Sequence, residues 1–483
     1  MAEVLYCKQG LTGPKIELHI APEGLTLVGR SGRSSTEYAP LADVTEVAAR
    51  QRGKVADLTV TFGAQRPAWV INGLPAANAA WAQSVITEER DGLDKRGRPE
   101  YSNALPANQL AEMCAGMVAS HDSRAAVDLV DLILAQGVLY GASDVHFDPF
   151  SQAILVRFRL DGVLYDMVRI DPAIKHHLAA RLKVVSHLTT FKKSVAQEGR
   201  ATLPMAGRTV DLRFSSIPTI HGEKVAVRIF DPAKSIFALT DLGMTAEMLA
   251  ALEKMLAAPQ GTILLTGPSG SGKTTTLYAS LAYLRENRKN LSSIATVEDP
   301  VEYDLQVVNQ TQVNSASGLT FANALRTVLR QDPEVIMIGE IRDSETADIA
   351  VQAGLTGHLV LSTVHARSAA GVLLRLIDLG VEPYLLASSV SAVLSQRLVR
   401  VVCKSCSGTG CEKCANSGYR GRTGVFQLLP ITEAMRDLVL KRCSLSELES
   451  KVEQEHVKSL LDDGLAKVEA GITTREELTR VLG

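Results

Sequence analysis

The segment GPSGSGKT at positions 267–274 constrains this chain more than any other part of its sequence. It satisfies G-x-x-x-x-G-K-[ST] at every fixed position, and it lies between the apolar run TILLT and the helical sequence TTLYASLAYLRE. Glycines allow the backbone N–H groups to surround an anion, and the positive end of the following helix faces the same anion. We therefore predict a loop that binds the phosphates of a nucleotide.

Within this loop, Lys273 would supply a cation to the outer phosphates, and the Thr274 hydroxyl would bind Mg²⁺. A flexible loop that matches the motif by chance would not be expected between a strand and a helix. The predicted nucleotide-binding residues are Gly267, Pro268, Ser269, Gly270, Ser271, Gly272, Lys273, Thr274 and Thr275.

Hydrolysis of a nucleotide also requires acidic groups that position the metal and a water molecule. From residue 262 onward, apolar strands alternate with helices, which predicts a parallel sheet covered on both faces. Glu340 follows the apolar run VIMIG, and Glu298 follows IATV. Both acids would leave the sheet at its carboxyl edge, beside the phosphate loop, and we expect both to be catalytic. The alternative is a helix cap or a solvated acid, which suits Asp299 better.

The length and composition of the chain limit its class. With 483 residues it can hold three or four domains, and its net charge of −2 argues against an electrostatic nucleic-acid binder. The opening MAEVLYCKQG has no charged-then-apolar leader, and no apolar run approaches about 18 residues. We therefore expect a cytosolic protein without a membrane span.

The patterns along the chain divide it into five parts. Strand-like alternation up to residue 73 and a helix at 76–90 predict a β-rich N-terminal module, PH-like in pattern, before a charged linker at 91–104. Mixed helices and strands follow, and 231–243 would be a hinge. The predicted parts are a β-rich module at 1–100, an α+β lobe at 105–233, a P-loop core at 240–400, a cysteine segment at 401–425 and a helical region at 426–483.

Four of the seven cysteines lie within twelve residues, in the pattern C-x-x-C-x₄-C-x-x-C. Two such pairs suit a tetrahedral Zn²⁺ bound by four thiolates, and the glycines at 408 and 410 would allow a tight turn between them. The alternative is a knob of reduced thiols or a redox pair. The predicted zinc ligands are Cys403, Cys406, Cys411 and Cys414.

Several of these segments resemble the secretion ATPases that drive type II secretion and type IV pilus assembly. The resemblance is carried by GPSGSGKTTTLY, TVEDPVEY, LRQDPEVIMIGEIRDSETA and GHLVLSTVHA, with ASDVHF and QEGR upstream, and it covers about 105–430. It implies an α/β fold in which a PAS-like lobe precedes a RecA-like P-loop ATPase core. It also implies ATP and Mg²⁺ as cofactors and a ring of six chains.

The same resemblance assigns roles to individual residues. Glu340 would be the catalytic acid of the Walker B motif, Glu298 would position metal and water, and His365 would sense the γ-phosphate. Arg213 and Arg228 would reach the nucleotide from the PAS-like lobe, although a surface ion pair is the alternative for each. His358 would belong to the same histidine box as His365, and Arg326 and Arg330 would match basic positions near the core's own site, with a surface ion pair as the alternative for each arginine.

The resemblance also implies partners. A cytoplasmic hexamer would act on an inner-membrane platform protein, and it would reach the inner face of the membrane only through proteins, including an adaptor. Residues 1–100 do not match the family's usual adaptor-binding domain, and the two cysteine pairs are separated by a shorter loop than is usual in the family. A zinc segment favours the assembly or secretion branch over the retraction ATPases of pili.

Two other functions fit parts of the sequence. The same type of core powers nucleic-acid translocases, helicases and DNA-uptake motors, but the neutral charge and the lack of aromatic residues among basic ones argue against direct nucleic-acid binding. A regulator with an inactive loop is the other alternative. The presence of Lys273, Thr274, Glu298 and Glu340 argues against it.

Overall fold

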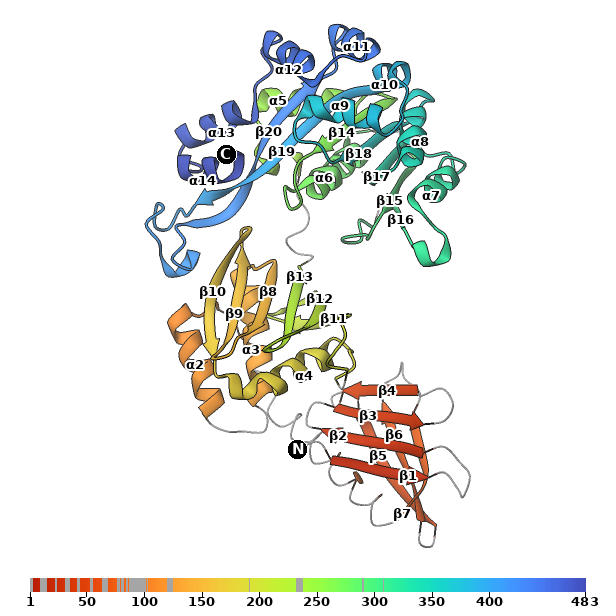
Figure 1. Cartoon of the computed structure of the whole chain (residues 1–483), viewed down its shortest axis with the longest axis vertical. Helices are drawn as coiled ribbons and strands as arrows, with labels where there is room; N and C mark the ends of the chain where they lie inside the picture. The colour runs from red at the N-terminus through yellow and green to blue at the C-terminus, as the bar shows by residue number, and fades with distance from the viewer. Residues whose placement is uncertain are drawn as a thin grey trace. The chain divides into compact units, whose positions relative to one another are not determined.

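The computed structural model divides the chain into two units, Met1–Asp231 and Pro232–Gly483, which are described separately (Figure 1). It describes all residues except 1–2, 9–14, 22–23, 31–34, 41–43, 53–54, 63–67, 76–78, 80–81, 84–85, 87–100, 102, 120–124, 191, 232–237, 289–290 and 307. In the described part of the chain, no helix is both long and apolar enough to cross a lipid bilayer.

The N-terminal module consists of two antiparallel sheets (Figure 1). Leu25, Leu58 and Ile71 are fully buried in its core, as the alternation of apolar and polar residues requires. Most of the predicted helix at 76–90 and most of the linker at 91–104 lie outside the described residues. The PH-like arrangement therefore stays a prediction. The strands are β1 (Glu3–Lys8), β2 (Lys15–Ala21), β3 (Gly24–Arg30) and β4 (Ser35–Pro40) in one sheet, and β5 (Val44–Arg52), β6 (Val55–Phe62) and β7 (Trp69–Pro75) in the other.

The second lobe is a six-stranded antiparallel sheet in the order β10-β9-β8-β13-β12-β11. Its apolar face packs on the helices, where Gly137 of α3 lies so close to the Val145 side chain that a Cβ would not fit. The edge strand β11 was not predicted, because Gly199 and Pro204 interrupt its alternation; proline is tolerated at an edge. The elements are α2 (Ala107–Ala119), α3 (Ala125–Tyr140), β8 (Asp144–Pro149), β9 (Ile154–Leu160), β10 (Val163–Ile170), α4 (Lys175–Val185), β11 (Gln197–Met205), β12 (Arg208–Thr219) and β13 (Gly222–Phe230).

The second unit is built on a seven-stranded sheet in the order β16-β15-β17-β18-β14-β19-β20. All neighbouring strands are parallel except β19 and β20. Every residue of β14 and β18 is buried, as expected for strands covered on both faces. The elements up to the sheet's last parallel strand are α5 (Ala246–Leu256), β14 (Gly261–Thr266), α6 (Lys273–Asn287), β15 (Ile294–Glu298), β16 (Asn309–Gln312), α7 (Phe321–Val328), β17 (Val335–Ile341), α8 (Ser344–Leu355), β18 (Leu359–Val364), α9 (Ala369–Asp378), α10 (Pro383–Ser389) and β19 (Val390–Val402).

The long antiparallel pair of β19 and β20 (Tyr419–Pro430) was not predicted. The two strands extend beyond the rest of the sheet and carry the cysteine segment at their tip (Figure 1). Four helices follow, in agreement with the predicted C-terminal helical region, and α13 and α14 lie against the two strands (Figure 1). They are α11 (Glu433–Leu440), α12 (Leu445–Gln454), α13 (Leu460–Glu469) and α14 (Arg475–Leu482).

Candidate nucleotide and metal sites

The predicted phosphate loop connects the buried strand β14 to the first turn of α6. Gly272, at the start of the helix, has φ of 86°, in the left-handed region. A Cβ at this position would also lie 2.8 Å from the Gln396 side-chain nitrogen. The loop therefore has the tight backbone path that the sequence predicted, and its N–H groups precede a helix whose positive end attracts anions.

Lys273 is the first residue of α6, and its ammonium group turns back over the loop. Its Nζ donates to the carbonyl oxygens of Gly267 at 2.8 Å and Pro268 at 3.0 Å. Burial lowers the pKa of Lys273 and the charge of Arg397 lowers it further, while the Glu340 carboxylate opposes both. The loop lysine, Glu340 and Arg397 thus belong to one electrostatic neighbourhood.

Glu340 lies near the end of β17, at the carboxyl edge of the sheet, and its carboxylate is mostly buried. Its Oε2 lies 3.5 Å from His365 Nε2, and its Oε1 pairs with the Arg342 guanidinium. The Glu340 carboxylate raises the pKa of Arg342. The structure therefore places the predicted acid and the predicted histidine together. Arg342 was missed by sequence reasoning, since a basic residue two positions after an acid has no distinctive pattern.

Glu298 is the last residue of β15 and is almost fully buried. It accepts hydrogen bonds from the Tyr278 hydroxyl, from Thr296 Oγ1 at 2.5 Å and from Gln310 Nε2 at 3.0 Å. Burial and the neighbouring carboxylate raise the pKa of Tyr278. A Cβ on Gly339 would lie only 3.5 Å from the Glu298 Cα, so Glu298 and Glu340 sit on adjacent strand ends. Three donors orient the Glu298 carboxylate, and none of them was predicted.

The predicted arginines of the second lobe are direct partners across two strands, Arg213 on β12 and Arg228 on β13. Arg228 Nε donates to Asp144 Oδ1 at 3.1 Å, and the Arg213 guanidinium lies 4.3 Å from the centre of the Phe230 ring. Both belong to the unit Met1–Asp231, whereas the loop belongs to the other unit. Their predicted contact with nucleotide is therefore untested.

The remaining predicted positions are less connected to the loop. Arg326 pairs with Glu345 on the exposed surface of α7 and α8, which matches the surface ion-pair alternative. Arg330 is exposed near the end of α7. His358 precedes β18 and its Nδ1 lies 3.1 Å from the Ala353 carbonyl oxygen, so the whole of β18 separates it from His365.

The four clustered cysteines converge, with all sulfur atoms within 4.8 Å of one another. The Sγ–Sγ distances are 3.9 Å for Cys403 and Cys411, 3.8 Å for Cys406 and Cys414, and 3.7 Å for Cys411 and Cys414. A tetrahedral Zn²⁺ with Zn–S bonds of about 2.3 Å would separate its sulfurs by about 3.8 Å, whereas a disulfide requires about 2.05 Å. The geometry therefore fits a four-thiolate zinc site.

Backbone N–H groups around the cysteines favour thiolates. Gly410 N donates to Cys406 Sγ at 3.3 Å, and Cys411 N donates to Cys414 Sγ at 3.2 Å. Burial would raise the pKa of the Cys414 thiol, but N–H donors from Cys411 and Gly418 outweigh burial and lower it to about 7. Such donors compensate the negative charge that a metal-bound thiolate carries.

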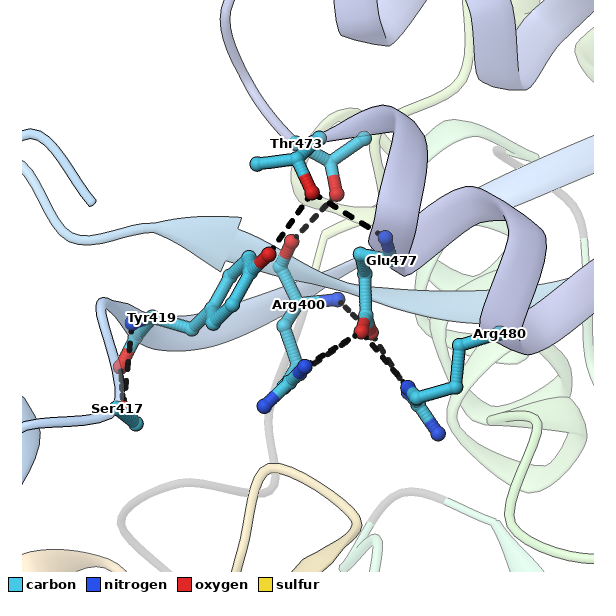
Figure 2. A network of polar contacts seen from close by, with 7 residues as sticks. Arg400, Ser417, Tyr419, Thr473, Glu477 and Arg480 are labelled. Atoms are coloured by element: carbon cyan, nitrogen blue, oxygen red, sulfur yellow. Dashed lines mark hydrogen bonds and ion pairs between the residues drawn. The ribbon is translucent and has the colours of Figure 1, made fainter. Parts of the chain in front are cut away.

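The base of the cysteine segment is held by a polar network with helix α14 (Figure 2). Glu477 accepts from the backbone N and Nε of Arg400, both at 3.0 Å, and from Arg480 Nε at 2.7 Å. The Arg400 guanidinium lies 4.0 Å from the centre of the Tyr419 ring, and the Tyr419 hydroxyl is 2.8 Å from Thr474 Oγ1. The network joins β19, β20 and α14.

Gln396 of β19 is a further residue that the sequence analysis missed. Its Nε2 donates to the Ser271 carbonyl oxygen at 2.7 Å, and its Oε1 accepts from Thr276 Oγ1 at 2.8 Å. The side chain is almost fully buried and ties the loop to the next strand of the sheet. A single glutamine in an apolar run carries no motif, so only the tertiary structure reveals it.

Comparisons with known proteins match most of the chain. A family model described as type II/IV secretion system protein matches residues 119–480. A type II secretion system ATPase E of Vibrio cholerae serotype O1 is 42% identical over 415 residues, which cover 81% of this chain and 80% of that protein. The type II secretion system protein HxcR of Pseudomonas aeruginosa is 40% identical over 445 residues, which cover 88% of this chain and 94% of that protein.

Solved structures show the same fold. The Legionella pneumophila ATPase DotB superposes with a TM-score of 0.59 at 21% identity, covering 73% of this chain and 94% of that one. The pilus retraction motor PilT with bound ADP superposes with a TM-score of 0.51 at 24% identity, covering 72% of this chain and 95% of that one. The predicted resemblance and the predicted fold class are confirmed.

Proposed function

Because the chain belongs to the type II/IV secretion system protein family, we propose that it is the ATP-hydrolysing motor that assembles pilin-like fibres in a type II secretion system or a type IV pilus. The family match and the identity to type II secretion ATPases support ATP hydrolysis in a secretion or pilus system. The four-cysteine segment supports the assembly or secretion branch, as the sequence analysis expected.

The observation that carries the proposal is the placement of Glu340 and His365 at the same sheet edge as the phosphate loop. Bound ATP would lie in the loop with Lys273 on its outer phosphates, and Thr274 would hold Mg²⁺, which neutralises phosphate charge. Glu340 would accept a proton from the attacking water, and Glu298, already oriented by three donors, would position metal and water.

His365 lies beside this acid and its side chain is more than half exposed, so it would contact the γ-phosphate and respond to its loss. Arg213 and Arg228 would supply positive charge to the transition state from the second lobe. In this proposal the chain works as a cytoplasmic hexamer. It would push on an inner-membrane platform protein and use an adaptor, through residues 1–100, to reach the membrane.

The test compares phosphate release by the wild-type protein and Glu340→Gln in the presence of Mg²⁺. Gln is close to Glu in shape but cannot take a proton, so we expect ATP binding to persist and turnover to fall by at least roughly 100-fold. Glu247→Gln on α5, which removes an exposed carboxylate that pairs with Lys458 and lies outside all of these motifs, is the matched control and should keep normal turnover.

An unchanged rate in Glu340→Gln would show that Glu340 is not the catalytic carboxylate that accepts this proton. A wild-type protein that releases no phosphate would contradict the whole proposal. Adding single-stranded DNA to the same assay tests the translocase alternative, which predicts strong, salt-sensitive stimulation.

A further inference from the structure

The strand beside the phosphate loop delivers a second cation to it. β14 and β19 are parallel neighbours in which Thr266 pairs with Ser395, so the next residues of β19 lie directly alongside the start of the loop. Gln396 bonds the loop at Ser271, as described above. Arg397 follows it, and its Nη1 would lie 3.3 Å from a Cβ placed on Gly267. A guanidinium group therefore lies against the first residue of the loop.

This guanidinium has few partners for its five N–H donors. Arg397 is partly buried, and its Nη1 donates to the Gln396 carbonyl oxygen at 2.9 Å. Among the residues that the structure describes, no carboxylate lies within ion-pair distance of it. Burial lowers the pKa of Arg397, yet it stays charged under ordinary conditions. A partly buried charge without an opposite charge costs free energy unless an anion compensates it.

The two cations Lys273 and Arg397 indicate which kind of anion would bind beside them. The charge of Arg397 lowers the pKa of Lys273, although the Glu340 carboxylate opposes this effect. A multiply charged phosphate chain would relieve this repulsion, and arginine binds phosphate oxygens bidentately. Both cations lie at the loop whose N–H groups and helix end already favour an anion.

We propose that Arg397 is a phosphate-binding residue of the nucleotide site, in addition to Lys273. The inference rests on the proposed function, because it assumes that the loop binds ATP. Gln396 would fix the distance between the strand and the loop, so that the Arg397 fork reaches the phosphate oxygens of the nucleotide that the loop holds.

The test measures the affinity of the full-length protein for a fluorescently labelled ATP with Mg²⁺, and thermal unfolding with and without ATP. Losing a charge-assisted hydrogen bond should raise the Kd of Arg397→Gln by roughly 10- to 100-fold. Arg397→Lys keeps the charge but loses the fork, so it should bind with intermediate affinity.

The matched control is Arg436→Gln. Arg436 is also partly buried, and its Nε donates to the Ile431 carbonyl oxygen at 3.3 Å. It belongs to α11, which follows the end of β20. That end of β20 pairs with the start of β19, and the phosphate loop lies further along β19. We expect this variant to bind ATP as the wild type does. The unfolding temperature of Arg397→Gln without ATP should stay near the wild-type value, while its rise with ATP should shrink.

The outcomes separate this inference from the proposed function. A wild-type protein that does not bind ATP would overturn both. Wild-type binding with an equal Kd for Arg397→Gln would overturn the inference alone. An Arg397→Gln protein whose unfolding temperature drops equally with and without ATP would show that Arg397 only supports the loop, and this would also overturn the inference.

Discussion

Replacing Glu477 with glutamine should weaken the attachment of helix α14 to the β19–β20 pair. The Glu477 side chain is fully shielded from solvent and lies between the guanidinium groups of Arg400 and Arg480 (Figure 2). A glutamine side chain keeps the size of glutamate but carries no charge. It would accept fewer of the five hydrogen bonds that the carboxylate receives, and it would remove the negative charge that faces Arg400, a largely buried cation.

The pKa of Glu477 gives the magnitude. Burial alone would raise it, but the hydrogen bonds from Arg480 and Arg400 outweigh burial and lower it from 4.5 to about 2. At about 1.4 kcal/mol per pKa unit, the difference corresponds to about 3 kcal/mol. The Arg480 side chain is almost half exposed, so solvent screens part of its share, and we expect a loss of about 2–3 kcal/mol.

The sign of the pH dependence follows from the lowered pKa. The stabilisation is fully present above pH 4.5 and is lost as the pH falls toward 2, because protonation then removes the charge that both arginines bind. The stability difference between the wild type and Glu477→Gln should therefore be constant from pH 5 upward and should narrow below pH 4.5.

Hydrogen exchange of the α14 amides at pH 7 measures the opening free energy of this helix, and urea unfolding at pH 7, 4 and 3 follows the pH dependence. Glu382→Gln, which removes an exposed carboxylate 3.5 Å from Arg442, is the control and should change little. A difference below 1 kcal/mol at pH 7, or one that does not change between pH 7 and pH 3, would refute the reasoning.

Two further predictions concern the metal site and the second lobe. Cys411→Ser removes one of four converging sulfurs, so the purified protein should lose zinc, measured by metal analysis. The backbone amides of residues 400–425 should also exchange hydrogen faster. Wild-type protein that contains no zinc when purified without chelator would contradict the zinc site. Arg213→Ala should lower ATP turnover by more than it lowers assembly of the proposed hexamer, measured by light scattering. Equal losses would indicate a structural role through its contact with Phe230.

The sequence could predict the parts of the site that depend on local chemistry. The phosphate loop requires glycine where a Cβ would clash, as at Gly272, and it requires a lysine directly after that glycine. A short sequence pattern therefore identifies the loop. Glu298 and Glu340 could be predicted because an acid at the end of a buried strand has a fixed position in a parallel sheet. The cysteine spacing likewise limits the possible geometry.

Residues whose role depends on long-range pairing could not be predicted. Tyr278 and Gln310 reach Glu298 from a helix and an edge strand, and neither has a spacing that relates it to an acid elsewhere. Arg397 lies 130 positions from Gly267 and becomes a neighbour only because β19 pairs with β14. The end of β19 was also missed. The strand runs to Val402, into the segment 401–425 that the sequence analysis assigned to metal binding alone.

The continuity of β19 has a mechanical consequence for any movement of the ATPase unit. Gln396 binds the phosphate loop and Arg400 binds α14, both from β19, and Cys403, the first residue after this strand, begins the cysteine segment. A strand rises about 3.3 Å per residue and is held to its length by its ladder of hydrogen bonds, here with β20. The span from Gln396 to Arg400, where the ladder is regular, is therefore fixed at about 13 Å. The base of the cysteine segment and α14 must then move together with the phosphate loop. Zinc bound by the four cysteines would therefore stiffen the tip of the β19–β20 pair, and the cysteine segment would not be a separate flexible module.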